Sequence, residues 1–210
     1  MKRKSLVMTA AAMLLAASAA AVTATSAFIN APRQVVPMID SLTRLDMIDY
    51  FVSGLETPST NALGGNSRVT ALDDEMVSFI TTEASRRDII MLPSGRDTVI
   101  AVITTIMLPT PDSTIDFYTA DWRPASGKKY FTVPSVKDWL TESGRRNRQP
   151  VDDALQFMTA AYEYSPEEAI LTLTNNVAGV LSREDSTAVA PLMKHELRYR
   201  RNGKKFSPLP

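Results

Sequence analysis

The segment DTVIAVITTIML, residues 97–108, is the part of the sequence that decides the fold. It is apolar along nearly its whole length and rich in β-branched residues, which favours a strand buried on both faces. Four neighbouring segments, residues 67–73, 75–82, 85–93 and 113–122, are also rich in Val, Ile, Thr and aromatic residues, and turn residues separate them. This pattern predicts a run of antiparallel strands with residues 97–108 in the centre.

One segment before these strands has the period of a helix. Residues 37–54 carry apolar side chains at helical spacing and end at a glycine, Gly54. The pattern predicts one amphipathic helix that packs against the sheet. Its apolar positions are Leu42, Leu45, Ile48, Val52 and Leu55.

Beyond residue 123 the pattern restarts. VPSVKDWL (133–140) resembles VPMIDSL (36–42), SPEEAILTLTNN (165–176) echoes SGRDTVIAVITT (94–105), and EDST (184–187) echoes PDST (111–114). We therefore expect an α+β fold, an antiparallel sheet with few helices, in one domain over residues 28–210. The echoes suggest two similar helix-plus-sheet halves, residues 36–123 and 133–210, although such short echoes also arise by chance.

The first 27 residues have the three regions of a secretory signal peptide. Lys2, Arg3 and Lys4 precede an apolar run over residues 6–22 and a small-residue exit. This order predicts cleavage after Ala27, or else after Ala24. The alternative, a membrane anchor, is disfavoured because the run is short and rich in alanine.

The expected location after cleavage is the periplasm of a Gram-negative bacterium or the outside of the cell. No later segment is apolar enough to span a membrane. The chain has no cysteine, which excludes disulfides, thiolate metal sites and lipid attachment to an N-terminal cysteine. Removing three of the 23 basic residues with the signal peptide leaves 20 against 23 acidic residues, a net charge of −3. A mildly acidic domain of this kind is not expected to bind nucleic acid.

The acidic stretch PDSTIDFYTADW, residues 111–122, is the first candidate for chemistry. In a strand, Ile115 and Phe117 share one face, while Asp112 and Asp116 share the other at about 13 Å from each other. That distance is too long for a shared proton, one metal ion or a pair of glycosidase carboxylates. We expect Asp112 to accept hydrogen bonds from the amides that follow it, and Asp121 to do the same where the strand ends.

Other catalytic or metal-binding patterns are weak. His195 is the only histidine, and the chain has no G-x-S-x-G elbow around a serine nucleophile. Asp46 and Asp49 lie one helical turn apart, but two carboxylates are too few ligands for calcium or magnesium. The chain also lacks a G-x-G-x-x-G motif and a P-loop. We therefore expect no catalytic residue, no metal site and no cofactor.

Basic side chains form the candidate binding site. HELRYRRNGKKFSPL, residues 195–209, predicts a hairpin with Asn202-Gly203 as its two-residue turn. This register places Arg201 opposite Lys204 and Arg200 opposite Lys205, an unfavourable arrangement unless an anion binds there. Charges that protect a sheet edge from aggregation would explain the same pattern. The candidate binding residues are Arg198, Arg200, Arg201, Lys204 and Lys205, and a second basic cluster contains Arg145, Arg146 and Arg148.

Several strings along the chain resemble a known family. They are RLDxxDY from Arg44, NxxGGxSxxTxL from Asn61, Leu92-Pro93, and PxxDSxIxFYxxDW from Pro109. Together they resemble the exported Bacteroidales proteins grouped as domain of unknown function 3256. The resemblance covers most of the mature chain and implies an exported protein of a Gram-negative bacterium. It implies no activity and no site residue.

Two functions stay open. The first is a non-catalytic module that binds or scaffolds an envelope protein or an anionic polymer. The alternative is a cell-envelope hydrolase that uses carboxylates from separate loops, because residues far apart in sequence can meet in space. The sequence favours the first function over an enzyme.

Overall fold

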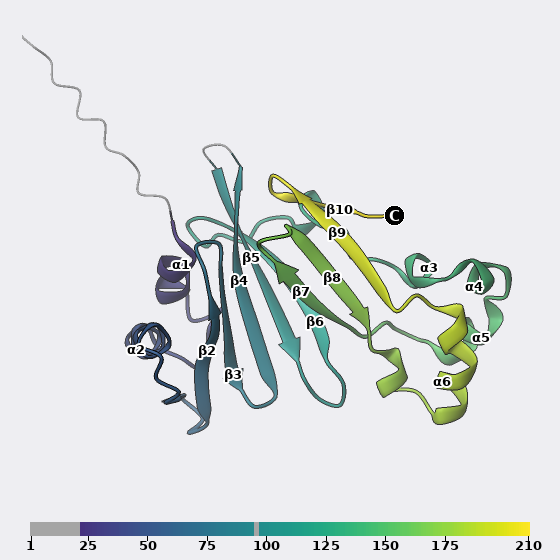
Figure 1. Ribbon diagram of the computed structural model, residues 1–210, viewed down its shortest axis with the longest axis horizontal. Coiled ribbons are helices and arrows are strands. Elements are labelled where there is room, and N and C mark those ends of the chain that lie inside the picture. The colour runs from purple at the N-terminus through teal and green to yellow at the C-terminus, as the bar shows by residue number, and fades with distance from the viewer. Residues whose placement is uncertain (1–21, 95–96) are drawn as a thin grey trace, which may run out of the picture.

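The computed structural model describes residues 22–94 and 97–210. Two antiparallel sheets form its framework, and helices lie beside the first sheet and at the far end of the second (Figure 1). Sheet 1 has six strands in the order β1-β2-β3-β4-β5-β6, and sheet 2 has four in the order β10-β9-β8-β7. The predicted α+β class is confirmed.

Sheet 1 is a meander formed by consecutive strands. They are β1 (Ser59–Thr60), β2 (Asn66–Leu72), β3 (Met76–Thr82), β4 (Ser85–Ser94), β5 (Asp97–Ile106) and β6 (Asp112–Thr119). Sheet 2 contains β7 (Ala160–Ser165), β8 (Ile170–Asn175), β9 (Glu196–Asn202) and β10 (Lys205–Pro208).

The helices fall into two groups. Beside sheet 1 are α1 (Ala24–Asn30) and α2 (Ser41–Val52). Around sheet 2 are α3 (Val136–Trp139), α4 (Glu142–Arg146), α5 (Gln149–Ala154) and α6 (Arg183–Val189), with 3₁₀ turns η1 (Gly127–Lys129), η2 (Val177–Gly179) and η3 (Ala190–Leu192). None of the helices in the described part of the chain is long and apolar enough to cross a membrane.

Sheet 1 is the middle of three layers, and each of its faces has its own core. On one face, Phe28 of α1 packs on Phe79 of β3 with ring centroids 4.6 Å apart. On the other face, sheet 2 covers strands β4 to β6. The central strand β5 contributes to both cores, with Ile100 in the first and Ile103 in the second. This confirms that β5 is buried on both faces.

The helix predicted over residues 37–54 begins later and presents a different face. Asp40 caps α2 by accepting a hydrogen bond from the amide of Thr43 at 2.8 Å, so the helix begins at Ser41. Its buried residues are Arg44, Met47 and Ile48. Of the five apolar positions predicted to cover the sheet only Ile48 is buried, and Leu42 and Val52 are 74% and 71% exposed. The buried face turns toward the sheet because Arg44 donates to the carbonyls of Phe28 and Ala31, both at 2.7 Å.

Helix α1 contains both predicted signal-cleavage points. Ala24, Ala27 and Phe28 are at most 1% exposed, and Thr23 caps the helix together with Ser26. Cleavage after Ala27 would remove most of this helix from the core. Residues 1–21 of the predicted signal peptide, which spans residues 1–27, lie outside the described part of the chain, and its cleavage site stays a prediction.

Each predicted half begins with helical structure that precedes antiparallel strands, but in the second half η2, α6 and η3 lie between β8 and β9. β5 and β8, which carry one pair of sequence echoes, are each the second strand of a hairpin. The echo between PDST and EDST is not structural, because the first begins strand β6 and the second lies in helix α6. Ser182 caps α6 through the amide of Asp185, and this local signal sets the helix.

Candidate binding groove between helix α2 and strand β2

The final hairpin has a different register from the predicted one. Lys205 lies opposite Asn202, and Arg200 lies opposite Ser207. The turn is therefore Gly203-Lys204, and Gly203 has a φ of +58°. Phe206, which is 3% exposed, pairs with Arg201 here and would pair with Tyr199 in the predicted register, and since these two partners share one face of β9, Phe206 faces the core in both registers. The predicted facing of like charges across this hairpin is wrong.

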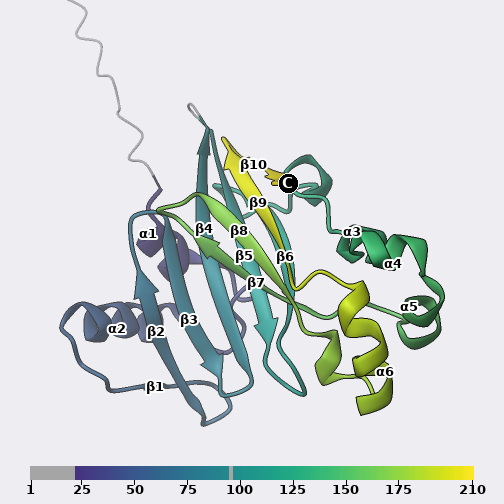
Figure 2. The same cartoon turned by 45° about the vertical axis from the view of Figure 1, so that its right-hand side comes forward.

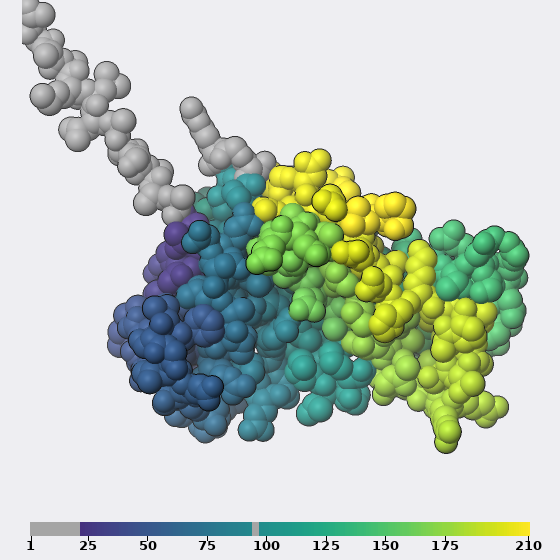
Figure 3. Space-filling model, viewed as in Figure 1, coloured from purple at the N-terminus to yellow at the C-terminus, as the bar shows by residue number. Residues whose placement is uncertain are grey.

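Two of the five predicted binding residues attach the hairpin to sheet 1. Arg201 donates to both carboxylate oxygens of Glu75, at 3.2 and 2.8 Å, and its side chain is 15% exposed. Lys204 lies 3.4 Å from the carboxylate of Asp97. The hairpin, yellow in Figure 3, lies beside the end of sheet 1 where these acids begin β3 and β5. These two charges are therefore used within the fold.

The other three predicted residues, Arg198, Arg200 and Lys205, are exposed. Arg198 lies 3.4 Å from Glu168. Arg200 and Lys205 form no ion pair with any residue that the structure describes. The predicted basic surface is thus reduced to three side chains on the outer face of the hairpin.

The acidic stretch 111–122 joins the two sheets. Asp112 accepts a hydrogen bond from the amide of Ala160 at 3.0 Å, and the hydroxyl of Ser113 accepts one from the amide of Tyr162 at 3.0 Å. Asp112 was predicted to bind the amides that follow it, but it binds strand β7 instead. Ser113, Ile115 and Phe117 face the core between the sheets, as the alternation predicts.

The end of this stretch forms a turn without help from Asp121. The amide of Arg123 donates to the hydroxyl of Thr119 at 3.2 Å, and Trp122 adopts a left-handed φ of +60°. The Trp122 ring packs on Tyr118 with centroids 5.5 Å apart. Thr119, and not Asp121 as predicted, therefore accepts the hydrogen bond at the end of the strand, and residues 111–122 have a structural role.

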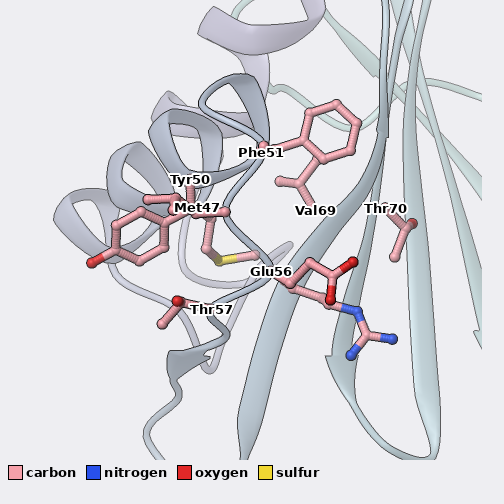
Figure 4. A pocket seen from close by; sticks show the side chains of 10 residues that line it. Met47, Tyr50, Phe51, Glu56, Thr57, Val69 and Thr70 are labelled. Carbon is pink, nitrogen blue, oxygen red and sulfur yellow. The ribbon is translucent and has the colours of Figure 1, made fainter.

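One groove suited to binding was not predicted from the sequence. It has a volume of about 550 Å³ and lies between α2 and β2. Met47, Tyr50 and Phe51 of α2, residues 54–57 of the following loop and residues 68–70 of β2 line it. Figure 4 shows Met47 and Phe51 on the helix side, Val69 on the strand side and Glu56 between them. We call it the α2–β2 groove.

The groove runs along an open strand edge. β1 covers β2 only at Ser59–Ser67 and Thr60–Asn66, and within the described chain no strand pairs with this side of residues 68–72. Continued pairing would place Pro58 opposite Arg68, but proline has no amide hydrogen to donate. The chain before β1 therefore leaves β2, and a strip of unpaired backbone remains beside the groove.

The lining combines apolar side chains with few charges. Met47 and Val69 are 2% and 6% exposed, while Phe51 and Leu55 are 37% and 54% exposed. Glu56 and Arg68 bring one charge of each sign. Leu55 also continues the exposed apolar stripe Leu42, Leu45 and Val52 along α2, the blue helix at one end of the molecule in Figure 3. A large exposed apolar surface next to an open strand edge is typical of a protein interaction site.

Asp88 of β4 is a buried carboxylate outside this groove. Burial raises the pKa of Asp88, and nearby Glu163 raises it further, while Arg86 at 3.1 Å opposes the rise. The Asp88 side chain is only 3% exposed, so a substrate does not reach it in this conformation. Among residues 22–94 and 97–210, no group of three or more His, Asp or Glu side chains could hold a metal ion.

Comparison with known proteins agrees with the family resemblance of the motif strings. The family model described as Protein of unknown function (DUF3256) matches residues 16–206. The chain belongs to this family. The structure of a domain of an uncharacterized protein from Porphyromonas gingivalis W83 is similar to that of this DUF3256 protein, with a TM-score of 0.72 and 22% identity over 88% of this chain and 96% of that chain. At this identity the likeness shows the fold alone. None of the curated proteins matches the sequence.

Proposed function

We propose that this DUF3256 protein is an exported, non-catalytic binding module. Its partner contributes an extended polypeptide segment that enters the α2–β2 groove and adds to β2 as a further strand. The open edge of residues 68–72 beside the groove carries this proposal. In strand addition, backbone hydrogen bonds supply affinity and pockets for alternate side chains supply selectivity.

The groove fits one extended chain better than a second sheet. α2 and residues 54–57 form its outer wall, and a β-bulge between Val69 and Ala71 interrupts the regular pairing of β2 with β3. Walls and bulges of this kind protect an edge from open-ended sheet pairing. A single strand can still lie between the wall and β2, where Phe51 and Val69 would contact its alternate side chains.

Export rests on the N-terminal sequence. The basic start, the apolar run and the small-residue exit support a periplasmic or extracellular location. The hydrolase alternative requires two carboxylates that face an open pocket at the separation that glycosidases use. Glu56 is the only carboxylate in the α2–β2 groove, and Asp88 is enclosed between the sheets. The binding function therefore has the better structural support.

The test begins with a phage-displayed library of linear peptides selected on the purified protein. Binding of a selected synthetic peptide is then measured by fluorescence anisotropy. Thr70→Trp fills the groove from an exposed position of β2 and should weaken binding at least about tenfold, the equivalent of about 1.4 kcal/mol. Thr114→Trp, at an exposed position of β6 in the same sheet, is the matched control and should bind normally.

Backbone methylation of the peptide separates strand addition from side-chain docking. Methylating amides that face β2 removes hydrogen bonds and should abolish binding, while methylating the alternate amides should have little effect. Equal effects of the two methylation patterns, or equal binding by Thr70→Trp and Thr114→Trp, would refute strand addition at this edge.

A further inference from the structure

A second groove, about 270 Å³ in volume, lies at the opposite end of the molecule from α2. It is formed by the segment before α3, by α3 and α4, and by strands β9 and β10. Figure 3 shows the surface hollowed between the yellow C-terminal strands and the green helices. Its charged lining residues are Arg145, Lys194, Arg198 and Asp138. The fold thus brings one member of each basic cluster found in the sequence, Arg145 and Arg198, to the same groove.

Two of the three cations in this groove have no counter-charge among the described residues. Arg145 and Lys194 form no ion pair with any described residue, although Lys194 is partly buried. Arg198 forms an ion pair with Glu168, outside the groove, at 3.4 Å. The carboxylate of Asp138 is already engaged, because one of its oxygens accepts hydrogen bonds from the amide and hydroxyl of Ser135 at 2.7 and 2.9 Å.

The positive charge of this groove favours an anionic ligand. Three cations and one carboxylate line the groove, and Glu168 outside it pairs with Arg198, so an excess of one positive charge remains. Removing part of the hydration of Lys194 without a counter-charge costs free energy, which an anion would offset. Guanidinium groups suit the oxygens of phosphate and sulfate because they donate two parallel hydrogen bonds. A groove just below the usual range of about 300–1,000 Å³ suits one charged group and its nearest atoms.

We propose that this groove binds the phosphate or sulfate ester group of an anionic ligand through Arg145, Lys194 and Arg198. The site differs from the α2–β2 groove in place and in chemistry, so it does not depend on the proposed strand addition. Apolar side chains such as Val133 and Leu209 line the same groove and would contact the body that carries the ester.

Calorimetric titration of the purified protein with glucose 6-phosphate, glucose 6-sulfate and glucose tests the proposal. At least one ester should bind and glucose should not, and the ester that binds more tightly identifies the preferred group. Arg145→Gln and Lys194→Gln should each weaken ester binding about tenfold, as expected for the loss of a charge-assisted contact. Arg146→Gln is the matched control, because Arg146 is the next residue of α4, pairs with Glu142 and does not line the groove.

Two results would overturn the proposal. One is the absence of heat with both esters at low ionic strength, where attraction between charges is least screened. The other is an equal loss of affinity in Arg146→Gln and Arg145→Gln, which would show only general attraction to a basic surface. Thermal melts of each variant check the fold, and the exposed Arg145 provides the test if Lys194→Gln proves unstable.

Discussion

We expect the position at which the folded chain begins to affect its stability. A chain that begins at Val22 keeps α1, whereas one that begins at Phe28 loses the buried methyl groups of Ala24 and Ala27 and the Thr23 cap. Two buried methyl groups are worth roughly 1.5 kcal/mol in total, and a helix cap about 1 kcal/mol. We therefore predict that the shorter chain is less stable by at least this sum.

Phe28 adds to the loss, because it is 0% exposed and would carry the new charged α-amine. If Phe28 stays in place, the charge is buried, and if Phe28 leaves the core, its contact with Phe79 is lost. Either outcome costs roughly 2–3 kcal/mol more. The total of about 4.5–5.5 kcal/mol corresponds to a melting temperature roughly 10–20 °C lower for a domain of this size.

Thermal melts of chains 22–210 and 28–210, followed by circular dichroism, measure this difference. Mass spectrometry of protein from its native source locates the real N-terminus; because α1 is buried in the core, we expect it before Thr23, and not after Ala27 or Ala24 as the sequence predicts. Equal melting temperatures for the two chains, with a native N-terminus at Phe28, would show that α1 is not part of the working core.

Three further predictions concern the contacts between the two sheets and the buried side chain of Tyr164. Ser113→Ala should lower the free energy of unfolding in urea by about 1–3 kcal/mol because the buried amide of Tyr162 loses its acceptor. Asp116→Ala on the exposed face should change it by less than about 0.5 kcal/mol. Similar effects of both substitutions would show that the hydrogen bond between Ser113 and Tyr162 does not stabilise the contact between the sheets. Burial raises the pKa of Tyr164 to about 12 from 10.0, so its contribution to stability is present below pH 10 and is lost as the pH rises toward 12. Tyr164→Phe should reduce the loss of stability at alkaline pH and cost little stability at neutral pH, since the Tyr164 hydroxyl has no hydrogen-bond partner among the described residues. If the melting temperature of Tyr164→Phe at alkaline pH equalled that of the wild type, ionisation of Tyr164 would not be the cause of the loss. A double-mutant cycle of Arg201→Gln and Glu75→Gln should give a coupling of about 1 kcal/mol, and a value near zero would mean that this pair does not hold the hairpin.

The sequence by itself determined the class of the fold and its central strand. Runs of β-branched residues separated by turns specify antiparallel strands locally, and the continuous apolar run of β5 requires cover on both faces. The alternation in β6 also gave the correct core face for Ile115 and Phe117. The sequence alone predicts these features because each depends on residues that are close to one another in the chain.

Only the tertiary structure decided which apolar and charged side chains are used within the fold. The stripe on α2 shows that the helix has an apolar face, but the hydrogen bonds from Arg44 to the carbonyls near α1 turn most of that face toward solvent. In the last hairpin, the Asn-Gly signal predicts a turn at residues 202–203, but the turn lies at Gly203-Lys204 and the cross-strand pairing shifts by two residues. Arg201 then reaches Glu75, 126 residues earlier in the chain. Both candidate sites arise from such distant contacts, and a local pattern carries no information about them, because a residue's period shows its face but not its partner.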